Sequence, residues 1–430
     1  AHAARAAGTC RGEVGAQIWR VRDEGGPEME VMLLGNGGCV TDARGGPEVG
    51  SVNEDGDGDG DGDGALGRLA VSLGDSRVEV WTVPRWSPST PRTRRANVSF
   101  AGVVPEDYGA PLCVDWNAAV PGRLAAGYSS GRVCVWDVDA DARGTAPTYP
   151  KFVITAAAQS GPCRVVRWPP LEHPEDASVC ANVFAAGADN AAKPHVLDLR
   201  APFAPLGDVF ERGAPWILDM AWLPRGSLVA GMETSDRSSA KSLRSATSAA
   251  AASKSLIQQF DLVADADDDG AQPTSTYQMP GRGAPWGIDA RASSNPRCAA
   301  AMVACASSNG VVAVSPLRFV GKRLRAASRP AFEPCAGLRA SDDETNATTT
   351  RANPVDPPTR FEFIVPGADD ASAREDAFPR GAAAAPGSRD APTTAQHRAR
   401  WSRAPSDEWW LASAGEAGFV RVQRFDATWA

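Results

Sequence analysis

The sequence predicts an all-β protein assembled from a repeated unit of short strands. Short apolar runs alternate with turns rich in Gly, Asp and Ser, which is typical of strands joined by hairpins. The same strand–turn–strand pattern returns along the chain, and a Pro-containing segment precedes several of its copies. Hydrophobic residues make up 43% of the 430 residues, enough for a folded core. No apolar run reaches the roughly 18 residues that a membrane-spanning helix needs.

The first copy is RLAVSLGDSRVEVWTV, at residues 68–83, with its turn at Gly74, Asp75 and Ser76. Further copies start at Arg123, Asn182, Met302 and Trp410, and a sixth is divided into Ser227–Thr234 and Ser255–Leu262. When the copies are aligned, one position of the final strand is occupied by Trp81, Trp136, Leu197, Phe260, Ser315 and Gln423.

A second element precedes four of the copies and predicts one more strand for each. The segments are GAPLCVDW from Gly109, GPCRVVRW from Gly161, GAPWILDMAW from Gly213 and GAPWGIDA from Gly283. Proline fits the entry of a strand, where the missing N–H does not weaken the ladder. Large residues end such strands, and we expect these to pack between neighbouring sheets: Trp116, Trp168, Trp222 and Trp401.

Units of four short strands with a Trp–Asp pair near the end are typical of the WD40-type β-propeller. One blade cannot bury both of its faces, so the units are predicted to stack in a ring. We expect a single propeller over residues 1–430 with seven blades, or six as the alternative. Gly15–Val21 resembles one more final inner strand. It is either completed by strands of the C-terminal blade or belongs to a chain whose N-terminus is missing.

Three insertions interrupt the predicted ring: an acidic Asp/Gly loop at residues 53–64, a Ser/Ala-rich segment at 235–254, and a largely disordered tract at 318–389. Within the last, Phe361–Pro366 is predicted as an isolated strand. Alternating Asp residues suggest a calcium loop, but no register supplies the Glu that its twelfth position requires. A flexible acidic loop is therefore the preferred interpretation.

No enzyme or metal chemistry is expected from the residues. Gly127–Gly131 matches the G-x-S-x-G pattern with Ser129 as nucleophile, but a strand follows where that motif requires a helix. His195 and His397 lie in predicted strands and are interpreted as packing or hydrogen-bonding residues. The nine cysteines are scattered singly without metal spacing. We expect Cys134, Cys163 and Cys305 to be buried apolar residues in a reducing compartment. The sequence thus predicts no catalytic residue, metal site or cofactor.

The candidate binding residues follow the entry prolines or lie in predicted loops. Trp216 and Trp286 follow the entry prolines and are candidates for a partner surface. A net charge of −8 excludes a globally basic nucleic-acid binder, but two basic stretches are predicted in loops. They could contact DNA or an acidic partner, the alternative being solvated loops. Their residues are Arg92, Arg94, Arg95, Lys322, Arg323 and Arg325.

Residues 395–423 resemble the last blade of the WD40 subunit of RNA polymerase III transcription factor IIIC, the second-subunit class. That family has a His-Arg-x-Arg-Trp strand, then Trp-Leu, then a Gly-x-x-Gly turn and a Val-Arg strand. The matching residues here are His397, Arg398, Arg400, Trp401, Trp410, Leu411, Gly415, Gly418, Val420 and Arg421. The entries at Pro215-Trp216 and Pro285-Trp286 are similar to that family as well. The long insertions and the absent N-terminal extension depart from it.

The resemblance implies a nuclear, non-catalytic scaffold subunit that needs no cofactor. Its implied partners are a second propeller subunit and the large DNA-binding subunit, with DNA itself contacted indirectly or weakly. The implied role is support of B-box recognition and of polymerase III transcription of transfer-RNA genes. The alternative is a different WD40 interaction scaffold, such as a histone-binding or ubiquitin-ligase substrate-receptor propeller, because one fold hosts many functions.

Overall fold

The structure of the protein is a computed structural model. It describes residues 13–20, 28–36, 38–46, 65–85, 91–141, 147–155, 161–171, 176–188, 194–202, 216–223, 226–233, 255–261, 273–278, 284–292, 300–318, 333–341, 360–364, 395–402, 409–415 and 420–425. These residues belong to two compact units. Unit 1 comprises Ala1–Asp189 and Pro194–Leu206, and unit 2 comprises Asn190–Lys193 and Gly207–Ala430.

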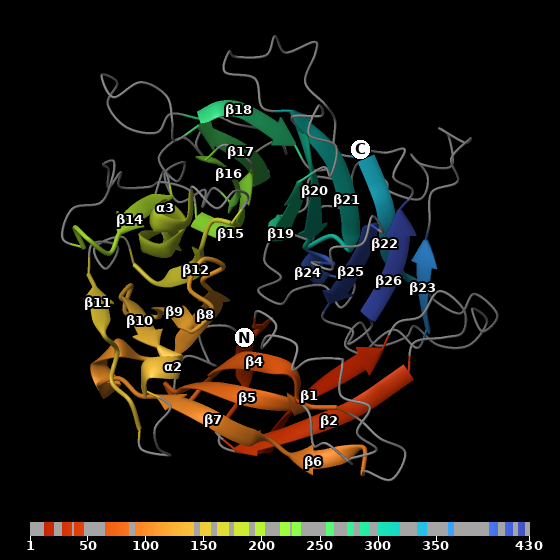
Figure 1. Cartoon of the computed structure of the whole chain (residues 1–430). Helices are drawn as coiled ribbons and strands as arrows, with labels where there is room; N and C mark the ends of the chain where they lie inside the picture. Colours follow the sequence, from red (N-terminus) through yellow and green to blue (C-terminus); the bar gives the residue numbers. More distant parts are fainter. Residues whose placement is uncertain are drawn as a thin grey trace, which may run out of the picture. The chain divides into compact units, whose positions relative to one another are not determined.

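Unit 1 contains four small sheets in its described part, which are numbered here in chain order (Figure 1). Sheet 1 has the order β1 (Glu13–Arg20), β2 (Glu28–Asn36), β6 (Thr93–Arg95). Sheet 2 is β3 (Val40–Gly45), β4 (Ala65–Leu73), β5 (Val78–Pro84), β7 (Asn97–Gly102). Sheet 3 is β8 (Pro111–Trp116), β9 (Arg123–Tyr128), β10 (Val133–Asp137), β11 (Phe152–Ile154), and sheet 4 is β12 (Cys163–Arg167), β13 (Val183–Ala188), β14 (His195–Asp198). Three short helices join them: η1 (Glu106–Tyr108), α2 (Val138–Asp141) and α3 (Ala177–Asn182).

Unit 2 contains three sheets in its described part. Sheet 5 is β15 (Trp216–Leu223), β16 (Ser227–Glu233), β17 (Ser255–Asp261), β18 (Pro273–Gln278). Sheet 6 is β19 (Pro285–Ala292), β20 (Ala300–Ser307), β21 (Val311–Arg318), β22 (Glu333–Ser341), β23 (Arg360–Ile364). Sheet 7 is β24 (Gln396–Trp401), β25 (Trp409–Gly415), β26 (Val420–Phe425). None of the helices in the described residues is long and apolar enough to cross a bilayer.

The seven sheets confirm an all-β, propeller-type organisation in which successive stretches of chain form successive blades. Every pairing inside them is antiparallel except that of β6 on β2, which is parallel. The predicted alignment of the copies is confirmed by the register. Each residue at the aligned position pairs with a Leu, Phe or Val on the preceding strand: Trp81 with Leu69, Trp136 with Leu124, Leu197 with Phe184, Phe260 with Leu228, Ser315 with Val303 and Gln423 with Leu411.

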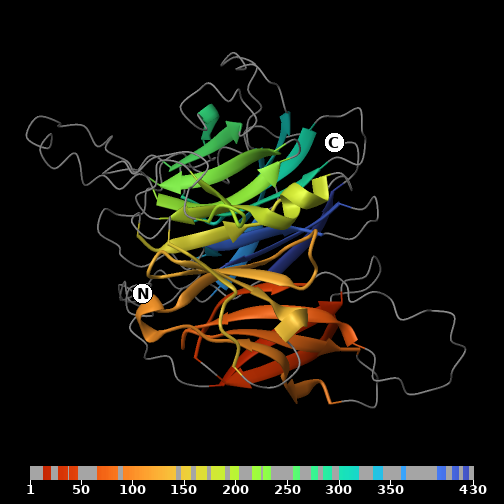
Figure 2. The same ribbon diagram turned by 60° about the vertical axis from the view of Figure 1, so that its left-hand side comes forward.

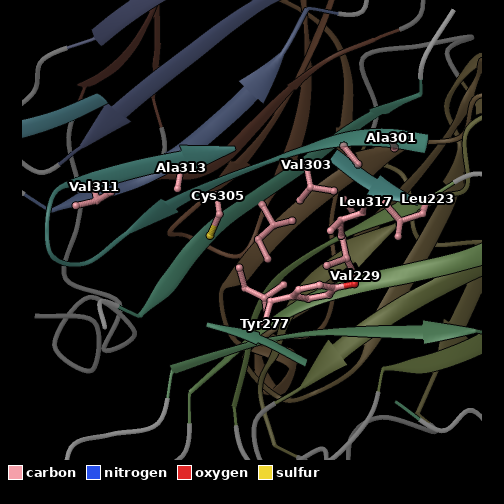
Figure 3. Packing of buried hydrophobic residues seen from close by; sticks show 13 residues of the cluster. Leu223, Val229, Tyr277, Ala301, Val303, Cys305, Val311, Ala313 and Leu317 are labelled. Carbon is pink, nitrogen blue, oxygen red and sulfur yellow. The ribbon is translucent and has the colours of Figure 1, made fainter. Parts of the chain in front are cut away.

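Hydrophobic clusters fill the space between consecutive sheets of each unit. In unit 1 they join sheets 1 and 2, sheets 2 and 3, and sheets 3 and 4. In unit 2 they join sheets 5 and 6, and sheets 6 and 7. Figure 3 shows the cluster between sheets 5 and 6, where Val229 and Tyr277 of sheet 5 meet Val303 and Cys305 of sheet 6. The terminal tryptophans predicted as inter-blade core are buried, at 8% exposed or less for Trp116, Trp168 and Trp401 and 9% for Trp222.

Carboxylates, three of them buried and one, Asp115, half-buried, add a second link between consecutive sheets. Asp42 of sheet 2 accepts the backbone N–H of Val114 in sheet 3 at 3.3 Å, and Asp115 of sheet 3 accepts that of Trp168 at 2.8 Å. Unit 2 repeats the arrangement with four other residues: Asp219 accepts from Ile288 at 3.0 Å, and Asp289 from Trp401 at 2.8 Å. Hydrogen bonds to ionised acceptors are stronger than neutral ones, so these links fix how neighbouring blades dock.

The entry prolines are positioned by the hairpins of their own blades. Ser129, in the hairpin turn after β9, donates its N–H to the carbonyl of Ala110 at 2.9 Å, directly before Pro111. Ser308 does the same to Ala284 at 2.9 Å, directly before Pro285. In these two blades a hydrogen bond therefore joins the Gly-Ala-Pro entry of the first strand to the turn that follows the second.

Three expectations differ from the structure. Completion by the C-terminal blade was one of two alternatives for Gly15–Val21, but β1 pairs with β2 in sheet 1. The strand at Phe361–Pro366 was expected to be isolated, but β23 pairs with β22 as the outer part of sheet 6. Pro91–Arg95 was expected in a loop, but Thr93–Arg95 forms β6 and pairs with Met32–Leu34 of β2. Only β6 pairs with a distant part of the chain, whereas β1 with β2 and β22 with β23 are pairs of consecutive strands. The residues 53–64 and 235–254 lie outside the described residues.

Candidate partner-binding surfaces

Trp286 lies at the start of the inner strand β19, one residue after the entry proline. Its side chain is half-buried and stacks on His397 of β24, with ring centroids 4.8 Å apart and an interplanar angle of 36°. The carbonyl of Trp286 accepts a hydrogen bond from the guanidinium of Arg398 at 3.2 Å. Unit 2 thus holds one half-exposed indole in place by a ring contact and a backbone hydrogen bond.

The strand that carries the His-Arg-x-Arg-Trp sequence docks on β19 over its whole length. Arg400 donates to the carbonyl of Ile288 at 2.9 Å and to the carboxylate of Asp219 at 3.1 Å. Gly287 permits the close approach, since a Cβ there would lie 2.7 Å from the carbonyl oxygen of His397 and 2.8 Å from the Cα of Arg398. Trp401 packs edge-on against Trp409, with centroids 5.6 Å apart. The motif therefore joins sheets 5, 6 and 7 of unit 2.

Trp216, the other candidate, is the first residue of β15 and pairs with Glu233 of β16. It is half-buried at the entry of sheet 5, as Trp286 is at the entry of sheet 6. Both candidates thus lie at equivalent places in their sheets. The sequence predicted a partner surface here, and that role stays a prediction.

The basic stretch of unit 1 lies on the outer strand of sheet 1. Arg92 and Arg95 are exposed and Arg94 is half-buried. Arg92 pairs with Glu28 at 2.8 Å and Arg95 with Glu13 at 3.6 Å. Ion pairs exposed to this extent contribute little to stability, so their guanidinium groups can exchange partners at low cost.

A cavity of about 180 Å³ opens beside this strand, within unit 1. It lies where sheets 1 and 2 meet, since its lining residues come from β2, β4, β5, β6 and β7. They are Leu33, Ala65, Thr82, Pro84, Arg94, Arg95 and Asn97. The sequence identified the two arginines but not the cavity, because its walls come from five strands spread over more than sixty residues.

Lys322, Arg323 and Arg325, the second basic stretch, lie outside the described residues.

The G-x-S-x-G segment lies on a hairpin, as interpreted from the sequence. Ser129 follows β9, and β10 begins at Val133 without an intervening helix. His195 is buried in β14, and burial lowers its pKa. The described residues contain no group of three or more His, Cys, Asp or Glu able to hold a metal ion.

The described cysteines are all free thiols, and the three expected to be buried are fully so. Burial raises the pKa of Cys134 to about 12 and raises that of Cys305 well above its usual value. Both thiols are therefore protonated at neutral pH, and they serve as small apolar residues of the core.

The intact Trp–Asp pair of sheet 3 serves the blade itself. Trp136 is fully buried and donates its indole N–H to the carbonyl of Thr148 at 3.2 Å. Asp137 pairs with Arg123 at 2.8 Å and also with Lys151. Arg123 extends this network to the helix α3, which directly precedes β13 of sheet 4, through the carbonyl of Ala181 at 2.9 Å.

Comparisons with known proteins add a structural likeness. Neither a family model nor a curated protein sequence matches the chain. Among solved structures, the WD40 domain of Toxoplasma gondii coronin is similar, with 15% sequence identity and a TM-score of 0.46 over 77% of this chain and 68% of that chain. The sheets and their registers, rather than this likeness, establish the fold class.

Proposed function

We propose that the chain is a non-catalytic scaffold subunit of transcription factor IIIC, of the second-subunit class, acting in the nucleus through protein–protein contacts. The observation that carries the proposal is the docking of β24 on β19. The residues shared with that family join three sheets of unit 2 and fix Trp286 at their edge. A motif with this effect builds a rigid platform rather than a catalytic site.

Trp286 has the properties of an anchor for a partner protein. Tryptophan is enriched among the few interface residues that dominate binding energies. An indole already held by His397 and a backbone already fixed by Arg398 lose little further freedom on binding, which favours affinity. Trp216 has the equivalent place in sheet 5. We propose that the second propeller subunit or the large DNA-binding subunit docks on this entry side of unit 2.

A direct role in DNA binding is limited by the charges. The net charge is −8, and two of the arginines on and beside β6 already pair with glutamates. Affinity for duplex DNA grows with the number of phosphates neutralised, and such a surface neutralises few. The proposal therefore leaves B-box recognition to the large subunit, with this chain supporting it and the polymerase III transcription of transfer-RNA genes.

The proposal is tested by purifying the tagged chain from its source cell and identifying its stable partners by mass spectrometry. Other factor IIIC subunits are expected, together with occupancy of transfer-RNA genes. Trp286→Ala should weaken recovery of one neighbouring subunit by about 30-fold, the effect of losing one interface anchor of about 2 kcal/mol. The matched control is Trp19→Ala in unit 1, which removes an indole that is 48% exposed and should leave recovery unchanged.

Recovery of cullin or chromatin-remodelling subunits in place of factor IIIC would refute the proposal and favour the alternative WD40 scaffolds. Equal recovery with wild type and Trp286→Ala would refute the assigned surface while leaving the complex itself intact. Circular dichroism of both variants separates a lost contact from a lost fold.

A further inference from the structure

The cavity between sheets 1 and 2 combines donors for an anion with an apolar wall. Arg94 and Arg95 line it together with Asn97 and Thr82. Leu33, Ala65 and Pro84 form the remaining lining. Leu33 is only 1% exposed and belongs to the core between the two sheets, so the inner end of the cavity rests on packed structure.

Strand pairing fixes where the two arginines lie. Arg94 pairs with Leu33 and Arg95 with Leu34 on β2, and Asn97 pairs with Thr82 on β5. The backbone of Ala96 links these two pairings and donates to the carbonyl of Leu34 at 2.8 Å. One short stretch of chain is thereby held by both sheets, and it supplies three of the residues that line the cavity, Arg94, Arg95 and Asn97.

The carboxylates next to the cavity favour a small single anion over a long polyanion such as a nucleic acid. Glu28 and Glu13 stand beside Arg92 and Arg95, so a nucleic-acid backbone running along the strand would meet carboxylates. An isolated phosphate group needs only the local donors. A forked guanidinium matches its oxygens, and charge-assisted hydrogen bonds of this kind are strong. The apolar lining suits the carbon atoms of a side chain that carries the phosphate.

We propose that this cavity binds one phosphate monoester carried on a side chain of a partner peptide, as in phosphoserine or phosphothreonine. Arg94 and Arg95 neutralise the charge, and Asn97 and Thr82 complete the donors. Glu13 is displaced from Arg95 when the phosphate enters, which costs little because both side chains are exposed, at 51% and 71%. The site does not depend on membership of factor IIIC.

The test measures binding of the purified full-length chain to a fluorescent pool of degenerate peptides centred on phosphoserine. The same pool with serine at the centre is the reference. The phosphoserine pool should bind at least 10-fold more tightly. Arg94→Ala and Asn97→Asp should each abolish this preference. Asn97 is exposed, so its substitution should leave the fold intact even if that of Arg94 does not. Arg92→Ala is the matched control, since Arg92 does not line the cavity.

Three results would overturn the proposal. The two pools could bind alike, Arg92→Ala could lower the preference as much as Arg94→Ala, or a short DNA duplex could displace the phosphopeptides at lower phosphate concentration than free phosphoserine. The last result would assign the arginines to nucleic acid. None of these results bears on factor IIIC membership, which the purification experiment decides separately.

Discussion

The two units contain the same link between blades but complete it differently. In each, a carboxylate of one sheet accepts a backbone N–H of the next sheet, and this happens twice in succession. In unit 2 the first carboxylate, Asp219, is also paired with Arg400 from the third sheet of the series at 3.1 Å. In unit 1 the first carboxylate, Asp42, has Arg44 of its own strand at 3.9 Å. One charge pair of unit 2 therefore spans three sheets.

At the aligned position of the final strand, by contrast, unit 1 has the larger apolar side chains. Unit 1 has Trp81, Trp136 and Leu197 there, all fully buried. Unit 2 has Phe260, then the small polar Ser315, then Gln423. Large apolar side chains supply burial energy at this position in unit 1. Sheets 6 and 7 of unit 2 lack that contribution, and the arginine contacts of β24 take over the joining of blades.

The largest expected loss of stability comes from removing one of the large aromatic side chains at this position. Trp136→Ala should lower the free energy of unfolding by about 4 kcal/mol, through lost burial, the cavity left behind and the lost bond to Thr148. Ser315→Ala changes the same strand position in unit 2. Its buried hydroxyl has no hydrogen-bond partner in the described part of the chain, so this variant should be neutral or more stable by up to about 1 kcal/mol.

Urea unfolding followed by tryptophan fluorescence and circular dichroism measures both variants. A Ser315→Ala variant that loses more than about 1 kcal/mol, a large effect for removing an unsatisfied hydroxyl, would contradict the statement that sheet 6 gains little from this position.

The next largest loss of stability is expected from removing the carboxylates that link consecutive sheets. Asp219→Ala leaves the guanidinium of Arg400 and the N–H of Ile288 without their buried acceptor, and should cost about 3 kcal/mol. Asp42→Ala removes the matching acceptor in unit 1 and should cost about 1.5 kcal/mol, the value of a charge-assisted hydrogen bond. The difference between the two unfolding midpoints is the quantity that tests the comparison. Equal losses would mean that Arg400 adds nothing to the link.

Pairing Asp219→Ala with Arg400→Met in one chain sharpens this result. The double variant should recover part of the loss, because it no longer buries an unpaired charge. An additive loss in the double variant would contradict a direct coupling between the two side chains.

The sequence was sufficient for the repeated strands because hydrophobic alternation and turn residues are local signals. The register of Trp136 on Leu124 and the burial of Trp168 follow from them. Pairings between distant segments were not predictable. The three residues of β6 carry no apolar alternation, and their partner β2 lies about sixty residues earlier. Strand β23 was predicted from sequence but without a partner, and β22, which pairs with it, lies in a polar tract and was not predicted.

The candidate site was predictable only in part, for the same reason. The position of Trp286 after a proline marked it from sequence, but its contacts with His397 and Arg398 lie more than a hundred residues away. Nothing in the sequence pattern indicated the role of Asp219. A single Asp within an apolar strand becomes meaningful only when Ile288 and Arg400 are brought to it by the docking of two further sheets.

The smallest effect concerns the acid sensitivity contributed by two paired carboxylates of unit 1; in unit 2, sheet 5 also has a carboxylate at this position, Asp261. Burial would raise the pKa of Asp137, but hydrogen bonds from Arg123 and Lys151 outweigh it and lower the pKa. The hydrogen bond from Arg200 likewise lowers the pKa of Asp198, the equivalent residue of sheet 4. A carboxylate with a lowered folded-state pKa stabilises the protein above its unfolded pKa, near 4, and this contribution is lost as the pH falls through the folded value.

Sheets 6 and 7 have Pro316 and Arg424 at the corresponding position, neither of which is a carboxylate. Unfolding midpoints between pH 6 and pH 2.5 should therefore fall less steeply in Asp137→Asn than in wild type, and less steeply again when Asp198→Asn is added. The difference at pH 6 should stay under about 1 kcal/mol for each, because the pairs are partly exposed to solvent. Parallel curves for all three proteins would mean that other carboxylates set the acid transition. The Trp–Asp network would then contribute to unit 1 only through the burial of Trp136, as its packing already indicates.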